Sequence, residues 1–246
     1  RVEQIKADRA AQKDRPRFAE TWARFIGAGN ATRLLIALGL GTAGFQMQDI
    51  LLEPYGGQVL GLTVSQTTRL TAIWAFGTLV AFGLSAQLLS RRVNPYRIAG
   101  AGSLVGVLAF AAVIMADPLA SPLLFRFGAL LIGFGGGLFA VGTLTAAMGM
   151  AESGGSGLAL GAWGAVQATS YGIAMFLGGT IRDLVDTFAP DSAFGADLSG
   201  PAVGYTAVYG LEIVLLLATL IAIGPLLLRG DDHARSPSKF GIAELP

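Results

Sequence analysis

Two amides and two carboxylates gather in the run FQMQDILLEPYGG, residues 45–57, at the end of a stretch that is otherwise apolar enough to span a bilayer. A charged side chain at membrane depth costs about 2.5 to 3.5 kcal/mol on insertion scales, so such residues usually face a cavity, a partner or a ligand. In a helix, Gln46, Asp49 and Glu53 share one face, while Gln48 lies about 100° round the axis from Asp49. The run therefore predicts a polar stripe with a binding or packing role.

Asp49 and Glu53 are expected near the outer end of the first span, and Arg69 opens the next span from the same side. This arrangement predicts a structural ion pair. Buried pairs do not reliably stabilise a fold, but losing one partner strands a charge and costs about 3 to 5 kcal/mol. The alternative is that these side chains contact a ligand or a partner directly.

Glu212 lies about nine residues into the last apolar segment, which is on the order of 14 Å deep and close to the midplane. Gln167, Ser170 and Tyr171 of the preceding segment are expected at similar depth, where they could share a proton or a hydrogen bond with it. A midplane acid is a candidate for proton coupling in a secondary transporter. Equally, a protonated Glu212 could bond a neighbouring helix.

The composition excludes several classes of enzyme. The 246 residues are 53% hydrophobic and only 13% charged, far below the roughly 25% charged residues of a soluble domain, which indicates an integral membrane protein. There is no cysteine and one histidine, His233, so disulfides, thiolate metal sites and multi-histidine metal sites are excluded. No nucleotide loop or nucleophile-base constellation is visible either, and we expect no enzymatic activity.

The apolar segments predict an all-α membrane protein with six transmembrane helices, since a span needs about 20 apolar residues. Residues 1–30 are expected to form a cytoplasmic loop, residues 31–228 the six-helix bundle and residues 229–246 a cytoplasmic tail. Pro54 and the Gly56-Gly57 pair predict the end of the helix that carries the polar stripe. The six spans are placed at Ala31 to Leu52, Gln66 to Ser90, Pro95 to Ala116, Pro122 to Met150, Gly157 to Val185 and Val203 to Leu228.

Lysine and arginine predict the orientation through the positive-inside rule. With the start of the chain inside, only Arg69, Arg126 and Arg182 of the 17 lysines and arginines fall outside, so both termini are predicted to be cytoplasmic. The segment Arg17 to Gly29 places Phe18, Trp22, Phe25 and Ile26 at helical spacing among charges, which predicts a short interfacial helix. The charged start suggests a fragment that begins inside a longer protein.

Glycine is abundant, with 35 residues, and several spans carry small residues four apart. Such pairs let helix backbones approach closely. Either they serve packing within the chain or they form a surface that docks another membrane helix. The pairs are Gly102 with Gly106, Gly133 with Gly137, and Gly157 with Gly161.

The segment FQMQDILLEPYGGQVLGLTVSQTTRLTAIWAFGTL, residues 45–79, resembles the seventh and eighth spans of the PucC/LhaA family. The most specific part is QxQDxxxEPYGG from Gln46, followed by TTxLT from Thr67. The resemblance implies the C-terminal six-helix half of a twelve-helix fold of the major facilitator superfamily. It also implies that the N-terminal half of the same protein is a partner, and that the charged start corresponds to the central loop.

The resemblance implies an assembly factor for light-harvesting complexes in the photosynthetic, intracytoplasmic membrane of a bacterium. The expected partners are antenna polypeptides or a photosynthetic core complex together with membrane lipids, and not nucleic acid. The expected cofactor is bacteriochlorophyll, with carotenoid or lipid as further candidates. The rival prediction is a proton-coupled secondary transporter of a small lipophilic solute, supported by the fold and by Glu212.

If bacteriochlorophyll binds here, its ligand cannot be the usual histidine. Gln46 or Gln48 could hold the chlorin magnesium through an amide oxygen, because Mg²⁺ prefers oxygen. The plainer alternative is interhelical hydrogen bonding, worth about 0.6 kcal/mol on average in membranes. Trp74 and Trp163 are candidate stacking surfaces for a flat pigment or ordinary packing residues. The predicted cofactor-binding set is therefore Gln46, Gln48, Asp49, Gln167, Trp74 and Trp163.

Overall fold

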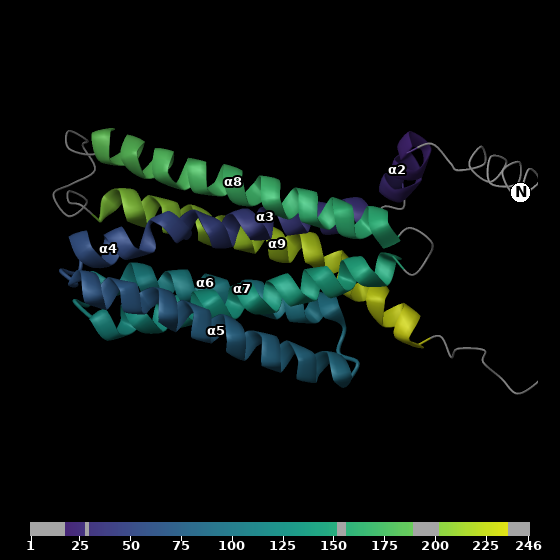
Figure 1. Ribbon diagram of the computed structural model, residues 1–246, viewed down its shortest axis with the longest axis horizontal. Coiled ribbons are helices and arrows are strands. Elements are labelled where there is room, and N and C mark those ends of the chain that lie inside the picture. The colour runs from purple at the N-terminus through teal and green to yellow at the C-terminus, as the bar shows by residue number, and fades with distance from the viewer. Residues whose placement is uncertain (1–17, 28–29, 152–155, 189–201, 236–246) are drawn as a thin grey trace, which may run out of the picture.

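The computed structural model describes residues 18–27, 30–151, 156–188 and 202–235, and every regular element within them is helical. Long helices lie side by side along the length of the molecule (Figure 1). The elements are α2 (Phe18–Gly27), α3 (Asn30–Gln46), the 3-10 turn η1 (Met47–Ile50), α4 (Leu52–Gln58), α5 (Val64–Ser90), α6 (Pro95–Ala116), α7 (Pro122–Ala151), α8 (Ser156–Phe188) and α9 (Val203–Arg235). The predicted all-α fold is confirmed.

Local signals in the sequence explain where two of these helices begin. Thr63 and Gln66 form a capping box at the start of α5, in which the Gln66 side chain accepts the Thr63 backbone N–H at 3.0 Å. Asn94 caps α6 by accepting the Tyr96 N–H at 3.0 Å, and Pro95 occupies the first helical position. Both caps leave the helix bodies free to be apolar.

The apolar character of the helices supports a multi-pass membrane protein. Helices α5, α6, α7 and α9 are long and apolar enough to cross a membrane, and the bent pair of α3 with η1 and α4 adds a fifth if it is one span. The fifth predicted span, Gly157 to Val185, falls in α8, which has 33 residues but whose most apolar stretch is less apolar than those of the other long helices because of residues such as Gln167, Ser170 and Tyr171. Six spans and the orientation of the termini therefore stay predictions.

The predicted stop at Pro54 and Gly56-Gly57 is wrong. The α-helix already ends at Gln46, continues as the 3-10 turn η1, and then restarts as α4 with a bend of 41°. Pro54 is the third residue of α4, where a backbone N–H has no partner inside the helix, so proline starts this short helix rather than ending one. Gly56 is buried, and a side-chain carbon there would meet the Phe125 ring at 3.0 Å.

Glycine lets α6, α7 and α5 approach closely. A side-chain carbon on Gly133 would collide with the Trp74 carbonyl oxygen of α5, and one on Gly102 would lie 2.5 Å from the Gly135 carbonyl oxygen of α7. Two of the three predicted glycine pairs thus serve packing within the chain. The third is different, because a side-chain carbon on Gly157 or Gly161 would meet nothing within 4 Å.

The first and last described helices, α2 and α9, can also be compared with the predicted interfacial helix and tail. The expected short helix is present as α2, where the Trp22 and Phe25 rings lie 6.0 Å apart, while its interfacial position stays a prediction. Helix α9 continues to Arg235, so the predicted tail 229–246 is helical at its start. Residues 1–17 and 236–246, and with them the predicted central loop and the rest of the tail, lie outside the described residues.

Candidate functional site

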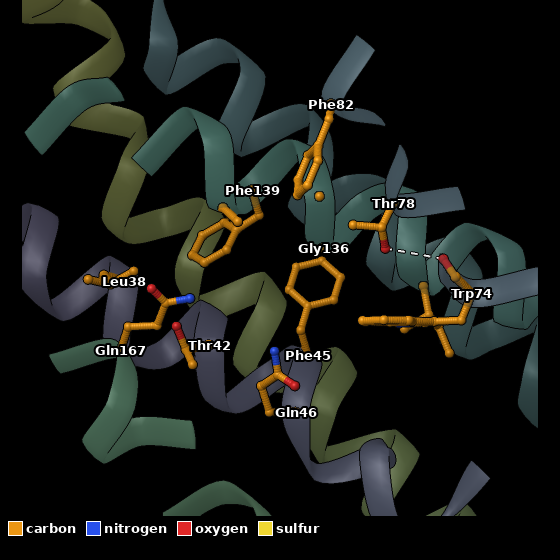
Figure 2. Close-up of a pocket in the computed structure, with 13 residues that line it drawn as sticks. Leu38, Thr42, Phe45, Gln46, Trp74, Thr78, Phe82, Gly136, Phe139 and Gln167 are labelled. Carbon is orange, nitrogen blue, oxygen red and sulfur yellow. Dashed lines mark hydrogen bonds between the residues drawn. The ribbon is translucent and has the colours of Figure 1, made fainter. Parts of the chain in front are cut away.

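A cavity of about 140 Å³ opens between helices α3, α5, α7 and α8 (Figure 2). Three of the residues predicted to bind a cofactor line it together: Gln46 at the end of α3, Trp74 on α5 and Gln167 on α8. They come from three helices far apart in the sequence. The full lining is Leu38, Thr42, Phe45, Gln46, Trp74, Thr78, Phe82, Ile132, Gly136, Gly137, Phe139, Ala140 and Gln167.

Polar and apolar groups are unevenly spread over this lining. Figure 2 shows Gln46, Thr42 and Gln167 close together on one side, with aromatic rings including Phe45 and Phe139 across the rest. A mostly apolar wall with a few grouped polar side chains is the usual construction of a small-molecule site. The amide oxygens of Gln46 and Gln167 are the groups here that could ligate a hard cation such as Mg²⁺.

Hydrogen bonds hold in place the part of α5 that lines the cavity. The Thr78 hydroxyl donates to the carbonyl oxygens of Trp74 and Gly133, each at 3.1 Å, and so ties α5 to α7 at the cavity wall. Gly136 of α7 also lines the cavity, and the Phe45 ring is its nearest neighbour there. A side-chain carbon on Gly136 would approach the Phe45 ring no closer than 3.6 Å, which is ordinary contact. A larger residue at position 136 would therefore extend into the cavity and meet a side chain first, not backbone.

Gln48 and Trp163, also predicted to bind a cofactor, lie outside this cavity. The 3-10 turn carries Gln48 into the core, where its side-chain Nε2 donates to the Phe45 carbonyl oxygen at 3.3 Å. The indole Nε1 of Trp163 donates to the Thr143 hydroxyl at 3.3 Å. Trp163 thus has the packing role that was its alternative, whereas the Gln48 side chain bonds its own turn of the chain and no other helix among the described residues.

The predicted ion pair of Asp49, Glu53 and Arg69 is not formed among the residues that the structure describes. Glu53 accepts the Thr71 hydroxyl at 2.6 Å, and Asp49 accepts the Tyr171 hydroxyl at 2.6 Å. Arg69 precedes Thr71 by two residues on α5, about 200° round the helix, so it is directed away from Glu53. Hydroxyl donors replace the arginine, and Asp49 contacts α8 rather than the cavity.

Glu212 is fully buried, as a midplane position predicts, but its partner differs from the expected ones. Its Oε1 accepts the backbone N–H of Gln48 at 2.7 Å, at the point where α3 gives way to η1. In the described part of the chain it forms no hydrogen bond with Gln167, Ser170 or Tyr171, and the Tyr171 hydroxyl donates to Asp49 instead. Sequence reasoning missed this contact because it did not foresee the helix break.

A cluster around Arg182 was also missed. Its guanidinium lies 2.9 Å from Asp183, 3.0 Å from Asp186 and 3.1 Å from the Gln58 side-chain oxygen at the end of α4. The Tyr205 hydroxyl of α9 donates to the same Gln58 oxygen at 2.8 Å. The spacing of Arg182 and Asp186, four residues apart, is the one signal in the sequence that could have indicated it.

Replacing Arg182 by alanine should destabilise the fold by about 1 to 3 kcal/mol, because hydrogen bonds to a charged group that joins α4, α8 and α9 are lost together. The measurement is the thermal unfolding midpoint of the purified protein in detergent. Arg69→Ala is the matched control, since Arg69 is exposed and forms no ion pair among the described residues, and it should leave the midpoint unchanged. Equal effects of the two substitutions would contradict this role of Arg182.

Comparison with known proteins adds a family to this geometry. The sequence profile of the family described as "PUCC protein" matches residues 1–230. The chain is 48% identical over 242 residues to an "Uncharacterized protein in puhA-bchM intergenic region" of Rhodobacter capsulatus, covering 96% of this chain and 50% of that protein. It is 47% identical over 212 residues to "Protein PucC" of Cereibacter sphaeroides, covering 86% of this chain and 45% of that protein.

A more distant relative carries a different name. The chain is 31% identical over 232 residues to the "Bacteriochlorophyll synthase 44.5 kDa chain" of Rhodobacter capsulatus, covering 91% of this chain and 50% of that protein. No solved structure matches. The chain spans about half the length of the curated relatives that it matches.

Proposed function

Because the chain belongs to the PucC family, we propose that it acts, without catalysis, as an assembly factor for bacterial light-harvesting complexes. In this proposal it binds or delivers bacteriochlorophyll in the photosynthetic membrane and docks antenna polypeptides or a core complex. The names of two relatives, one from the puhA-bchM intergenic region and one called a bacteriochlorophyll synthase chain, support a role close to this pigment.

The observation that carries the proposal is the convergence of Gln46, Gln167 and Trp74 on one cavity. When bound, the pigment supplies a flat apolar ring system and a magnesium ion that accepts an oxygen ligand. Gln46 and Gln167 are the amides that would hold the magnesium, and Trp74 is the ring that would stack on the macrocycle. Without histidine or thiolate the hold is weak, which suits a protein that passes its pigment on.

The size of the cavity limits how much of a pigment this chain holds by itself. Sites that enclose a drug-sized ligand usually measure about 300 to 1,000 Å³, well above the 140 Å³ found here. We therefore place only part of the pigment in the cavity. The remainder lies at its mouth, against the N-terminal half of a twelve-helix protein of the major facilitator type, for which half-length coverage of the relatives leaves room.

The rival function, proton-coupled transport of a small lipophilic solute, calls for an acid that communicates with the substrate site. Among the described residues Glu212 is the buried acid, but it bonds the Gln48 backbone and is absent from the cavity lining. Glu212 therefore touches no solute in the cavity directly and can affect the cavity only through the helix break at Gln48, which favours the assembly role over direct proton coupling.

The test is an absorption spectrum, with subunit identification, of the protein purified gently from its native membrane. We expect near-infrared bacteriochlorophyll bands and co-purifying antenna polypeptides. The double variant Gln46→Leu, Gln167→Leu should carry at least fivefold less pigment per protein. Gln87→Leu is the matched control, because Gln87 is an exposed glutamine of α5 outside the cavity, and it should keep the pigment.

Two results would count against the proposal. A colourless protein without antenna partners would remove the pigment role. Equal pigment in the double variant and in the Gln87→Leu control would move the pigment away from this cavity.

A further inference from the structure

Buried polar atoms without a partner gather where the first span breaks. Among the described residues, the unpartnered atoms include Gln48 Oε1, the Tyr209 hydroxyl and Glu212 Oε2. Gln48 and Glu212 are joined by the 2.7 Å bond from the Gln48 backbone N–H to Glu212 Oε1, and Tyr209 precedes Glu212 by one turn of α9. A buried polar atom left unpaired costs about 1 to 3 kcal/mol, so several at one place require an explanation.

In the described part of the chain, no ion pair balances a negative charge on Glu212. The ion pairs in the described residues are those of Arg182 with Asp183 and Asp186. Arg33 and Arg97 belong to the first turns of α3 and α6. An unpaired ionised carboxylate in the apolar interior is far more costly than a neutral carboxyl group.

Among the described residues, the other titratable groups packed near this position are tyrosines and an aspartate, which carry no positive charge. The Tyr209 ring packs against Tyr55 of α4 at 5.5 Å and Phe110 of α6 at 6.0 Å. Asp49 of η1 is exposed and accepts the Tyr171 hydroxyl of α8. None of these groups can therefore neutralise Glu212 by pairing with it.

One proton resolves two of the three unpartnered atoms. With a proton on Oε2, Glu212 becomes neutral and gains a donor, and Gln48 Oε1 is an acceptor oxygen in need of one. The other carboxyl oxygen, Oε1, keeps the bond from the Gln48 backbone. A protonated Glu212 would then have a donor to offer Gln48 Oε1 while it accepts the Gln48 backbone N–H.

We propose that Glu212 holds a proton and, through Gln48, fixes the break between α3 and η1. Gln46 lies two residues before Gln48 and is the last residue of α3, so the same contact sets where this cavity residue lies. Glu212 is thus a positioning residue. The inference rests on the geometry of the break and does not require that the cavity binds pigment.

The test is infrared difference spectroscopy on the protein in lipid at pH 8, where exposed carboxyl groups, with pKa values of about 4, are ionised. The spectrum of the wild type minus that of Glu212→Gln should contain the C=O stretching band of a protonated carboxylic acid. Gln48→Met should shift this band to higher frequency, because the acceptor of the proton is lost. Glu53→Gln, which changes an exposed glutamate bonded to Thr71, should leave the band in place.

A difference spectrum that shows only the loss of carboxylate bands would overturn the proposal. If Glu212→Gln does not fold, wild-type protein with ¹³C-labelled glutamate can be used to test for the same bound proton. A C=O band at pH 8 that shifts on labelling supports the bound proton, and the absence of any such band refutes it. Neither readout depends on pigment, so the result stands apart from the test of the assembly function.

Discussion

Replacing Gly133 by leucine should reduce the amount of folded protein in the membrane at least tenfold. The added side chain would begin at the Trp74 carbonyl oxygen and lie 3.1 Å from the Thr78 hydroxyl at its first carbon. Backbone atoms cannot move aside as a flexible side chain does. The loss in free energy of unfolding should therefore exceed the value typical of overpacking, which is about 1 to 3 kcal/mol. Helices α5 and α7 would separate, and the bond from the Thr78 hydroxyl of α5 to the Gly133 carbonyl oxygen of α7 would break.

The measurement is the monodisperse fraction of a fluorescent fusion after detergent extraction. Gly161→Leu is the matched control, because Gly161 belongs to a glycine pair of the same spacing but faces open space. The control should accumulate as the wild type does. Normal accumulation of Gly133→Leu would show that the close approach of α5 and α7 is not required for the fold.

Replacing Gly136 by leucine should empty the proposed pigment site while the helices stay in place. The first carbon of the new side chain meets the Phe45 ring at 3.6 Å, and the rest extends among the rings that line the cavity. A leucine side chain occupies a large share of a space of 140 Å³. Bound bacteriochlorophyll per protein should fall about tenfold, with the thermal midpoint lowered by only a few degrees.

The readout is the ratio of near-infrared to protein absorbance after gentle purification, taken with the thermal midpoint. Gly83→Leu is the control, since Gly83 is an exposed glycine of α5 with nothing within 4 Å of the added carbon. Full pigment in Gly136→Leu would place the pigment elsewhere. A collapse of the thermal midpoint would instead show that Gly136 is required for packing, and the Gln46 and Gln167 substitutions would then decide.

Much of the helical architecture follows from the sequence. The apolar segments anticipated α5 and α6 to within two residues at each end, because their length and the caps at Thr63 and Asn94 are local properties. The membrane class followed from composition in the same way. Of the three glycine pairs expected to serve helix packing or docking, two bring helices of this chain together, those of Gly102 and Gly133.

The candidate site was only partly predictable. Gln46, Trp74 and Gln167 were chosen for their chemistry, but nothing local indicated that α3, α5 and α8 would bring them to one cavity. Gln48, two residues from Gln46, was chosen on the same grounds and lies in the core instead. The direction of the Gln48 side chain depends on the change from α-helix to 3-10 turn after Gln46.

The sequence by itself determined which segments are apolar, which are capped and which chemical groups are available, since these depend on residue type and near neighbours. Tertiary structure alone decided the break at Met47, the bond from Gln48 to Glu212 and the choice of Tyr171 and Thr71 over Arg69 as partners of the acids. The physical reason is that a buried polar group takes whichever partner the packed helices bring within reach. That partner lies 18 to 164 residues away in these three bonds.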